Sequence, residues 1–181
     1  ANSIYQNMVT RNILSLTDET NALQLNGITS LLTKKSTQFK LWNQSTVYDG
    51  FNGFYAPEKT QTWIGQVDNA HLSETVDFID YDSKANLLGF TQNGGTPTTL
   101  TWYSNAGKAN QIHTQKVASG TDAEQVTTFN YKPLVGVSSI IKPNMTEYTY
   151  TYDNFNRLFQ VAGPEGIEQE IKYPPCCRLS N

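Results

Sequence analysis

The sequence predicts an all-β protein made of consecutive antiparallel β-hairpins, which form an open twisted sheet or part of a β-shell. Aromatic residues recur at a fixed interval, because Tyr131, Tyr152 and Tyr173 are 21 residues apart and Tyr81 and Trp102 have the same separation. Turn-forming residues recur between these aromatics. A period of this length, with strand and turn signals inside each copy, indicates a repeat of hairpins.

Strand alternation is clearest where three tyrosines stand at every second position. Tyr148, Tyr150 and Tyr152 are expected on one face of a strand, with Thr149 and Thr151 on the other. Aromatic and β-branched residues are the types that favour a pleated, half-buried surface. This segment therefore predicts a strand with one packed and one solvated face.

Each repeat centre carries a Tyr, a short turn and an apolar residue six positions after the Tyr. Leu87, Val137 and Leu158 hold this last position. A second turn begins about twelve residues after the Tyr. The second turns are Asn93-Gly94-Gly95, Pro143-Asn144-Met145 and Pro164-Glu165-Gly166. Gly and Asn tolerate positive φ and Pro presets the preceding residue, so each copy predicts strand, turn, strand, turn.

Three regions are expected along the chain. Residues 1–75 form an irregular β region that caps the repeats, residues 76–173 form the repeated hairpins, and residues 174–181 form a flexible tail. Two Asn-Gly pairs in the first region, Asn26-Gly27 and Asn52-Gly53, predict hairpin turns, because this dipeptide is the strongest short-range hairpin signal.

The Tyr-Asp dipeptides with their flanking residues resemble the RHS or YD-repeat proteins. The matching segments are Tyr81-Asp82 with Ala85-Asn86-Leu87, and Tyr152-Asp153 with Asn156-Arg157-Leu158 and Gly163-Pro164-Glu165-Gly166. Ala85 and Asn156 replace the usual turn glycine, Met145 replaces the glycine of a second turn, and Lys132 replaces an Asp. The positions that carry the repeat are Tyr81, Asp82, Leu87, Trp102, Tyr131, Val137, Tyr152, Asp153, Arg157, Leu158, Gly166 and Tyr173.

The resemblance implies a non-enzymatic scaffold or shell module of a large bacterial secreted or cell-surface protein, which acts in extension, toxin encapsulation or adhesion. A closed shell needs many more hairpins than 181 residues supply. The chain is therefore expected to be a fragment or a small open-sheet relative. Sheet edges present unpaired backbone groups, so the expected partners are other repeats of the parent chain or a second copy, with a glycan or toxin cargo as further candidates.

Composition excludes several other classes. A net charge of −3, with 16% charged residues, predicts no nucleic-acid partner. No apolar window is long enough for a membrane span. The two cysteines, Cys176 and Cys177, are adjacent and cannot join distant parts of the chain, so no disulfide framework is expected and their redox state is open.

No catalytic signature, cofactor motif or metal-ligand spacing is present, so neither an enzyme nor a cofactor is predicted. His71 and His113 have no carboxylate or Cys at ligand spacing and are interpreted as strand or loop residues. The acidic cluster Asp77, Asp80 and Asp82 is interpreted as a solvated polar face, with Asp80 and Asp82 on one side of a strand. A remote alternative pairs Asp80 or Asp82 with Glu165 or Glu168 as the carboxylates of a glycoside hydrolase.

Aromatic residues give the main alternative function, a carbohydrate-binding β-module. Trp63, Trp102 and Tyr103 are the candidates for rings that stack on sugars, and Trp42, Tyr148 and Tyr150 belong to the same wider set. The competing interpretation is that these rings form the packed face of the sheet, as the repeat tyrosines do. Exposure of Trp63 or Trp102 discriminates between the two.

Overall fold

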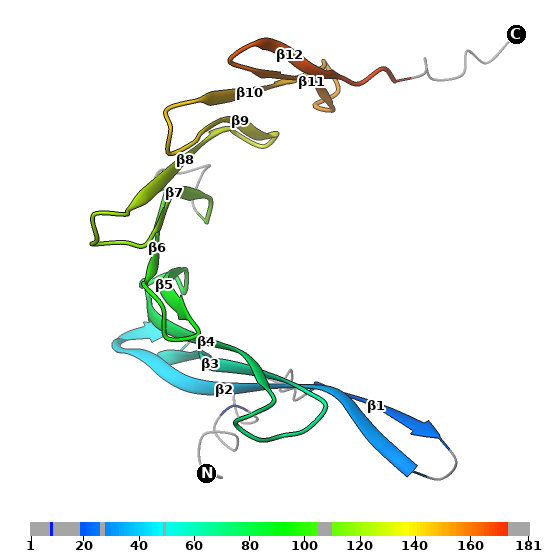
Figure 1. The fold of residues 1–181 in the computed structure, drawn as a ribbon. Helices are drawn as coiled ribbons and strands as arrows, with labels where there is room; N and C mark the ends of the chain where they lie inside the picture. Colours follow the sequence, from blue (N-terminus) through cyan, green and yellow to red (C-terminus); the bar gives the residue numbers. More distant parts are fainter. Residues whose placement is uncertain (1–7, 9–18, 26–27, 49, 105–109, 174–181) are drawn as a thin grey trace, which may run out of the picture. The chain divides into compact units, whose positions relative to one another are not determined.

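The protein is all-β, and its strands follow one another as antiparallel hairpins in an open sheet (Figure 1). The computed structural model describes residues 8, 19–25, 28–48, 50–104 and 110–173. Within these residues the strand order in the sheet is the order in the sequence, with no crossover. The strands are β1 (Glu19–Leu25), β2 (Ile28–Tyr48), β3 (Phe51–Ile64), β4 (Leu72–Tyr81), β5 (Leu87–Gln92), β6 (Thr98–Trp102), β7 (Ile112–Val117), β8 (Gln125–Lys132), β9 (Gly136–Ile141), β10 (Glu147–Tyr152), β11 (Leu158–Gly163) and β12 (Gly166–Glu170).

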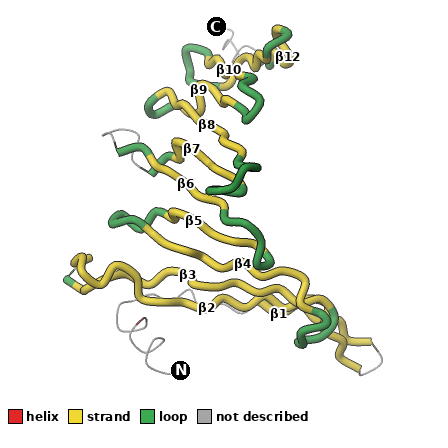
Figure 2. Tube along the Cα trace, turned by 60° about the vertical axis from the view of Figure 1, so that its left-hand side comes forward, coloured by secondary structure: helices red, strands yellow, loops and turns green. Residues whose placement is uncertain are grey.

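The chain divides into two compact units. The first unit comprises residues 1–99 and 117–119, and the second comprises residues 100–116 and 120–181. Figure 2 shows short turns between strands in both units. The first unit contains the longest strands, β2 and β3, whereas the strands from β9 onward have five or six residues each. The predicted boundary between the capping region and the repeats, at residues 75 and 76, falls within β4 and stays a prediction.

Two hairpins begin the first unit. β1 and β2 pair antiparallel up to Leu25 and Ile28, and the predicted turn residues between them, Asn26 and Gly27, lie outside the described residues. β2 and β3 pair up to Tyr48 and Phe51, so the Asn52-Gly53 turn predicted from the sequence is wrong. The chain reverses between Tyr48 and Phe51, before Asn52 is reached.

Gly53 instead lies inside β3, opposite a bulge in β2. The register shifts between Trp42 and Val47, where residues 43–46 of β2 lie opposite Gly53 alone, and Gly53 has a φ of 72°. A side chain at Gly53 would clash with the Trp42 carbonyl. Glycine is therefore required by a bulge and a close backbone approach, two other reasons for glycine within a strand.

An aromatic cluster forms the core of the first unit. Trp42, Ala56 and Tyr81 are buried, and Phe54, Phe78 and Leu87 pack against them. The Tyr81 ring is the centre, with ring centroids 5.1 Å from Trp42, 5.8 Å from Phe54 and 6.5 Å from Phe78. Polar groups within the cluster are satisfied, since the Trp42 indole N–H donates to the Ala56 carbonyl at 3.2 Å.

The repeat frame predicted from the sequence is confirmed by strand register. Tyr81 is paired with Leu87, Tyr131 with Val137, and Tyr152 with Leu158. In each pair the apolar residue six positions after the Tyr is its partner on the next strand. The 21-residue period therefore describes a structural unit of the sheet.

Burial along β10 confirms the predicted alternation. The tyrosines at positions 148, 150 and 152 are half-buried, whereas Glu147, Thr149 and Thr151 are exposed. Turn geometry also agrees with the departures noted in the sequence. Ala85, Met145 and Asn156, which stand where glycine was expected, have φ values of 64°, 62° and 59°.

Candidate functional site

The repeat tyrosines of the second unit link successive hairpins through their hydroxyl groups. Tyr152 donates a hydrogen bond to the Val137 carbonyl at 2.8 Å, and Tyr173 donates to the Leu158 carbonyl at 2.9 Å. Both bonds span 15 residues. Val137 and Leu158 are the partners of the preceding repeat tyrosines, Tyr131 and Tyr152. Each hydroxyl therefore ties its own hairpin to the one before it.

Tyr81 makes a comparable bond in the first unit, from a more buried position. Its hydroxyl donates to the Pro57 carbonyl at 3.0 Å. Burial raises the pKa of Tyr81 to about 12. Burial also raises the pKa values of Tyr131 and Tyr152, with a further contribution from Tyr103 and Tyr150 respectively. The Tyr81 and Tyr152 hydroxyls therefore keep the proton that each donates to a backbone carbonyl.

The Asp of each Tyr-Asp pair organises the turn that follows it. In the β4–β5 turn the Asp82 carboxylate accepts bonds from the backbone N–H groups of Lys84 and Asn86, both at 2.8 Å. In the β10–β11 turn Asp153 accepts from Phe155 and Arg157 at 2.8 and 3.0 Å. A side chain that accepts from backbone N–H groups two residues on is the Asx arrangement. The two turns have the same design although they lie in different units.

The charge of these carboxylates is stabilised by the turns. Burial opposes the charged form of Asp82, but hydrogen bonds from Asn86 and Lys84 outweigh it and lower the pKa of Asp82 below its usual value. Burial likewise opposes ionisation of Asp153, and the bonds from Arg157 and Phe155 again lower its pKa. Both aspartates are therefore ionised, and their carboxylates hold the turns by accepting hydrogen bonds.

Arg157 joins the second of these turns to the last repeat tyrosine. Its Nη2 lies 2.7 Å from the Asp153 carboxylate, and its guanidinium lies 4.1 Å from the centre of the Tyr173 ring. One repeat earlier Gly136 holds the equivalent position, and a Cβ there would lie 2.7 Å from the Tyr152 hydroxyl oxygen. The repeat therefore packs its Tyr against either a bare backbone or a planar cation.

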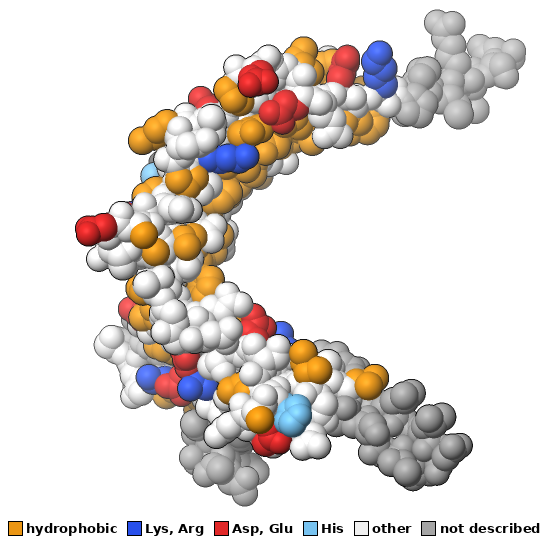
Figure 3. Space-filling view, in the orientation of Figure 1, with side chains coloured by type: hydrophobic (Ala, Val, Ile, Leu, Met, Phe, Trp, Pro, Cys, Tyr) orange, Lys and Arg blue, Asp and Glu red, His pale blue; other side chains and the backbone are white. Residues whose placement is uncertain are grey.

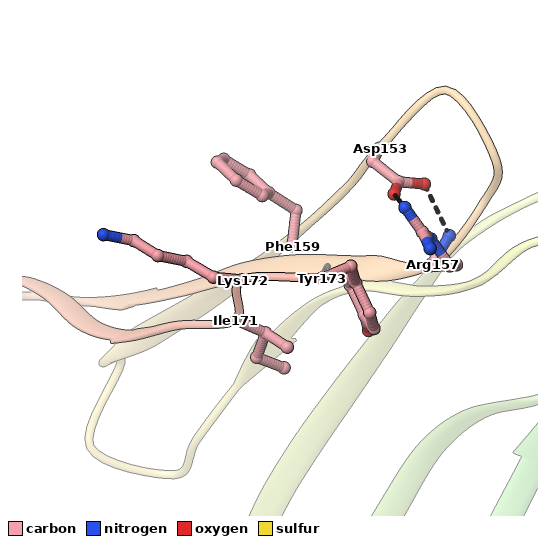
Figure 4. Close-up of a pocket in the computed structure, with 6 residues that line it drawn as sticks. All are labelled: Asp153, Arg157, Phe159, Ile171, Lys172 and Tyr173. Carbon is pink, nitrogen blue, oxygen red and sulfur yellow. Dashed lines mark hydrogen bonds and ion pairs between the residues drawn. The ribbon is translucent and has the colours of Figure 1, made fainter. Parts of the chain in front are cut away.

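A shallow groove of about 430 Å³ lies beside this Arg157–Tyr173 contact (Figure 4). Its lining residues are Asp153, Arg157, Phe159, Ile171, Lys172 and Tyr173. The close-up shows the Asp153–Arg157 ion pair at one end of the groove and the Phe159 and Lys172 side chains away from it. The Asp153 and Arg157 side chains thus form an ion pair with each other at that end of the groove.

The three rings proposed to stack on sugars lie in different settings. Trp63 and Trp102 are half-buried, and Trp63 is on β3 opposite Lys34 and Leu72. The Tyr103 hydroxyl donates to the Phe129 carbonyl and the Asn130 side chain, and its ring lies 4.5 Å from His113 and 6.0 Å from Tyr131. Tyr103 therefore packs as a structural residue, and Trp42, from the wider set, belongs to the core.

The histidines do not form a metal centre in the part of the chain that the structure describes, where no cluster of three or more metal-ligating residues occurs. The expectation that His71 has no carboxylate beside it is wrong. Its Nδ1 lies 2.7 Å from the Asp68 carboxylate, and hydrogen bonds with His71 lower the pKa of Asp68. Both side chains are exposed. Asp68 and His71 lie in the β3–β4 turn, and the reversal of the chain there brings residues three apart into contact.

The acidic residues considered for hydrolysis are engaged in local contacts. Asp77 pairs with Lys59 at 3.0 Å, and the Asp80 carboxylate accepts from the Tyr81 N–H at 2.8 Å. Asp82 lies beyond the end of β4, and a register shift precedes it, so it does not share a strand face with Asp80 as predicted. Glu165 and Glu168 belong to the second unit.

The main feature that the sequence interpretation missed is the set of carbonyls that accept from the tyrosines. Val137 and Leu158 share the 21-residue spacing of the tyrosines, but this spacing does not say which carbonyl a tyrosine hydroxyl reaches. Cys176 and Cys177, together with the predicted tail, lie outside the described residues. On the face shown in Figure 3, charged side chains of both signs are scattered among hydrophobic and uncharged polar ones.

The chain was also searched for membrane-spanning helices and compared with known proteins. Among the described residues no helix has the length and apolar character needed to cross a membrane. A comparison with protein-family models and with curated proteins finds no match for the chain.

Proposed function

We propose that this chain is a non-enzymatic structural module of the YD-repeat type, in which hairpins add one after another to extend a scaffold or shell. The observation that carries the proposal is the repeated tyrosine link. Tyr152 and Tyr173 make the same hydroxyl-to-carbonyl bond at the same sequence separation. Such recurrence is typical of a repeat array, in which each unit contacts its neighbours.

The chemistry of the repeat positions supports the same role. Asp82, Asp153 and Arg157 satisfy turn N–H groups or one another, and the tyrosines satisfy backbone carbonyls. Each of these side chains is used to hold a strand or turn in place. The proposed setting is a secreted or cell-surface protein of a bacterial envelope, with extension, adhesion or the enclosure of a toxin cargo as its task.

The proposed partner is another strand that pairs with the edge of the array. β12 is the last strand in the order, and all five of its residues are exposed. The Ile171 N–H donates to the Phe159 carbonyl on β11, so the N–H of Glu170, the adjacent residue, points toward the other side of the strand. Exposed strand edges are templates for pairing with another chain.

The test is size-exclusion chromatography with light scattering over a range of protein concentrations. The proposal predicts that the oligomers become larger as the protein concentration rises. Glu170→Pro should reduce their size, because proline removes an edge N–H. Glu170→Gln is the matched control, since it changes the side chain and keeps the N–H. A monomer at every concentration, or equal oligomerisation of both variants, contradicts pairing at this edge.

Carbohydrate binding is the second candidate, favoured by the partial exposure of Trp63 and Trp102. Rings that stack on sugars need an accessible face, which the buried Trp42 does not have. Tryptophan fluorescence titrated with soluble polysaccharides is the measurement. Saturable quenching that is lost in Trp63→Ala or Trp102→Ala supports this role, and unchanged emission removes it.

A further inference from the structure

The tips of three turns in the second unit carry large apolar side chains that are directed into solvent. Leu134 is 96% exposed, Met145 83% and Phe155 78%, the highest values among the large hydrophobic residues that the structure describes. In the first unit the corresponding tips carry Ser83-Lys84-Ala85 and Asn93-Gly94-Gly95. Exposed apolar side chains that gather at one place mark interaction sites more often than isolated ones do.

Two of these turn residues, Leu134 and Met145, have a backbone conformation that is sterically unfavourable for a residue with a side chain. Leu134 has a φ of 60° and Met145 a φ of 62°, the left-handed region in which glycine or asparagine has little steric cost. Leu134, which is 96% exposed, gains almost no packing energy in exchange, whereas Met145 lies beside Val126 and Ile141. Side chains held in such positions without a folding benefit point to a function.

Leu134 and Phe155 lie on the same edge of the sheet. They are 21 residues apart and occupy the β8–β9 and β10–β11 turns, which are alternate turns of an antiparallel array. Two strand spacings separate them, roughly 10 Å. Met145, in the β9–β10 turn, lies on the opposite edge.

Charge distinguishes these two edges. The edge with Leu134 and Phe155 carries the exposed Lys132 and Lys172, while its Asp153 is neutralised by Arg157. The opposite edge, with Met145, carries exposed acidic groups at Asp122, Glu147 and Glu165 and one exposed lysine, Lys142, whose ammonium lies over the Tyr148 ring. Apolar tips beside lysines are complementary to one kind of surface in particular, the interface of a bilayer that contains anionic lipid.

We propose that the edge formed by the β8–β9 and β10–β11 turns docks on an anionic lipid surface, with Leu134 and Phe155 inserted among the headgroups and Lys132 and Lys172 facing lipid phosphates or carboxylates. This role goes beyond scaffolding and does not depend on strand pairing at β12. Two inserted side chains give reversible, salt-sensitive association, because each buries one apolar group and the lysine attraction is screened by salt.

The experiment is co-flotation with vesicles of phosphatidylcholine with and without phosphatidylserine, at low and high salt. The wild-type chain is expected to float with phosphatidylserine vesicles and to lose binding when serine lipid is omitted or salt is raised. The double variant Leu134→Gly with Phe155→Asn is expected to bind at least about tenfold more weakly, since two apolar side chains no longer enter the interface.

Folding and binding are separated by the design of these variants. Leu134→Gly relieves the left-handed backbone and is expected to raise the melting temperature while it weakens binding. Met145→Gly gives the same relief on the opposite edge and is expected to leave flotation within about twofold of wild type.

Four results would overturn the proposal. The first three are absence of flotation by the wild-type chain, equal flotation of the double variant, and equal loss of flotation in Met145→Gly. A fourth is a lipid-free oligomer that the double variant abolishes, because the tips would then dock on a second copy of the chain.

Discussion

The two units of this chain are stabilised in different ways. The first unit buries Trp42, Ala56 and Tyr81 in one aromatic cluster, whereas Ser139 is the single buried residue among those described in the second unit. Tyrosine hydroxyls bonded to carbonyls recur through the second unit, along with a turn held by Asp153. Burial of large rings concentrates stability in one place, while repeated polar links distribute it along the chain.

Trp42→Ala is expected to have the largest effect and to act on the first unit. Removal of a buried Trp ring costs about 3–5 kcal/mol, because the cavity cannot close fully. The variant also loses the indole bond to the Ala56 carbonyl. Hydrogen exchange followed by mass spectrometry should show faster exchange in β2–β5 and unchanged exchange in β9–β12. Equal acceleration in both units would mean that the cluster stabilises the whole chain.

Tyr152→Phe tests the distributed links of the second unit. Loss of the hydroxyl leaves the Val137 carbonyl without its donor, and the expected cost is about 1 kcal/mol. Tyr150→Phe is the matched control, since it lies on the same strand and face but outside the 21-residue frame. Urea unfolding measures both. A cost for Tyr150→Phe as large as that for Tyr152→Phe would show that the repeat position has no special role.

Replacement of left-handed turn residues by glycine should raise the unfolding free energy, by less than the preceding variants lower it, in both units. Ala85→Gly and Met145→Gly should each stabilise the protein by about 0.5–1 kcal/mol, because relief of backbone strain exceeds the entropy lost by glycine. The reverse change, Gly94→Ala, adds a methyl group in open space at a φ of 67° and should destabilise by a similar amount. Thermal melts of the three variants check the signs, and stabilisation by Gly94→Ala would contradict the argument.

Acid sensitivity is the smallest effect and comes from the two turn aspartates. The folded-state pKa values of Asp82 and Asp153 are lowered, so their contribution is present above the unfolded pKa of about 3.9 and is lost as pH falls through the folded values. Asp82→Asn and Asp153→Asn should each flatten the fall in unfolding free energy below about pH 4. Urea midpoints at neutral and acid pH make the comparison. An unchanged pH profile in both variants would contradict a role for the charged form.

The repeat frame could be predicted because it depends on residue types that are close together in the sequence. Alternation of Tyr and Thr, and Gly or Asn in turns, report directly on strand faces and backbone angles. The position six residues after each Tyr, held by Leu87, Val137 and Leu158, was visible for the same reason. The strand register of the hairpins follows from these local signals.

Features that depend on the neighbouring strand could not be predicted. Gly53 looked like a turn residue, but it lies within β3 where a bulge of β2 brings the Trp42 carbonyl close to it. The carbonyl acceptors of Tyr152 and Tyr173 are likewise set by the strand that packs alongside. The contact of His71 with Asp68 depends on the shape of one turn. For Gly53 and for the carbonyl acceptors the backbone of a neighbouring strand decides the outcome, whereas the contact of His71 with Asp68 is decided within a single turn.

The central claim is that 21 residues form one interchangeable structural unit, and removal of one unit tests it most directly. Deletion of residues 132–152 joins Tyr131 to Asp153 and preserves the frame of every later position. Deletion of residues 132–151 removes one residue fewer and moves the following side chains to the opposite face. Circular dichroism with thermal melting should show a β spectrum and a cooperative transition for the first deletion only. The same behaviour in both deletions would contradict the repeat as a structural unit.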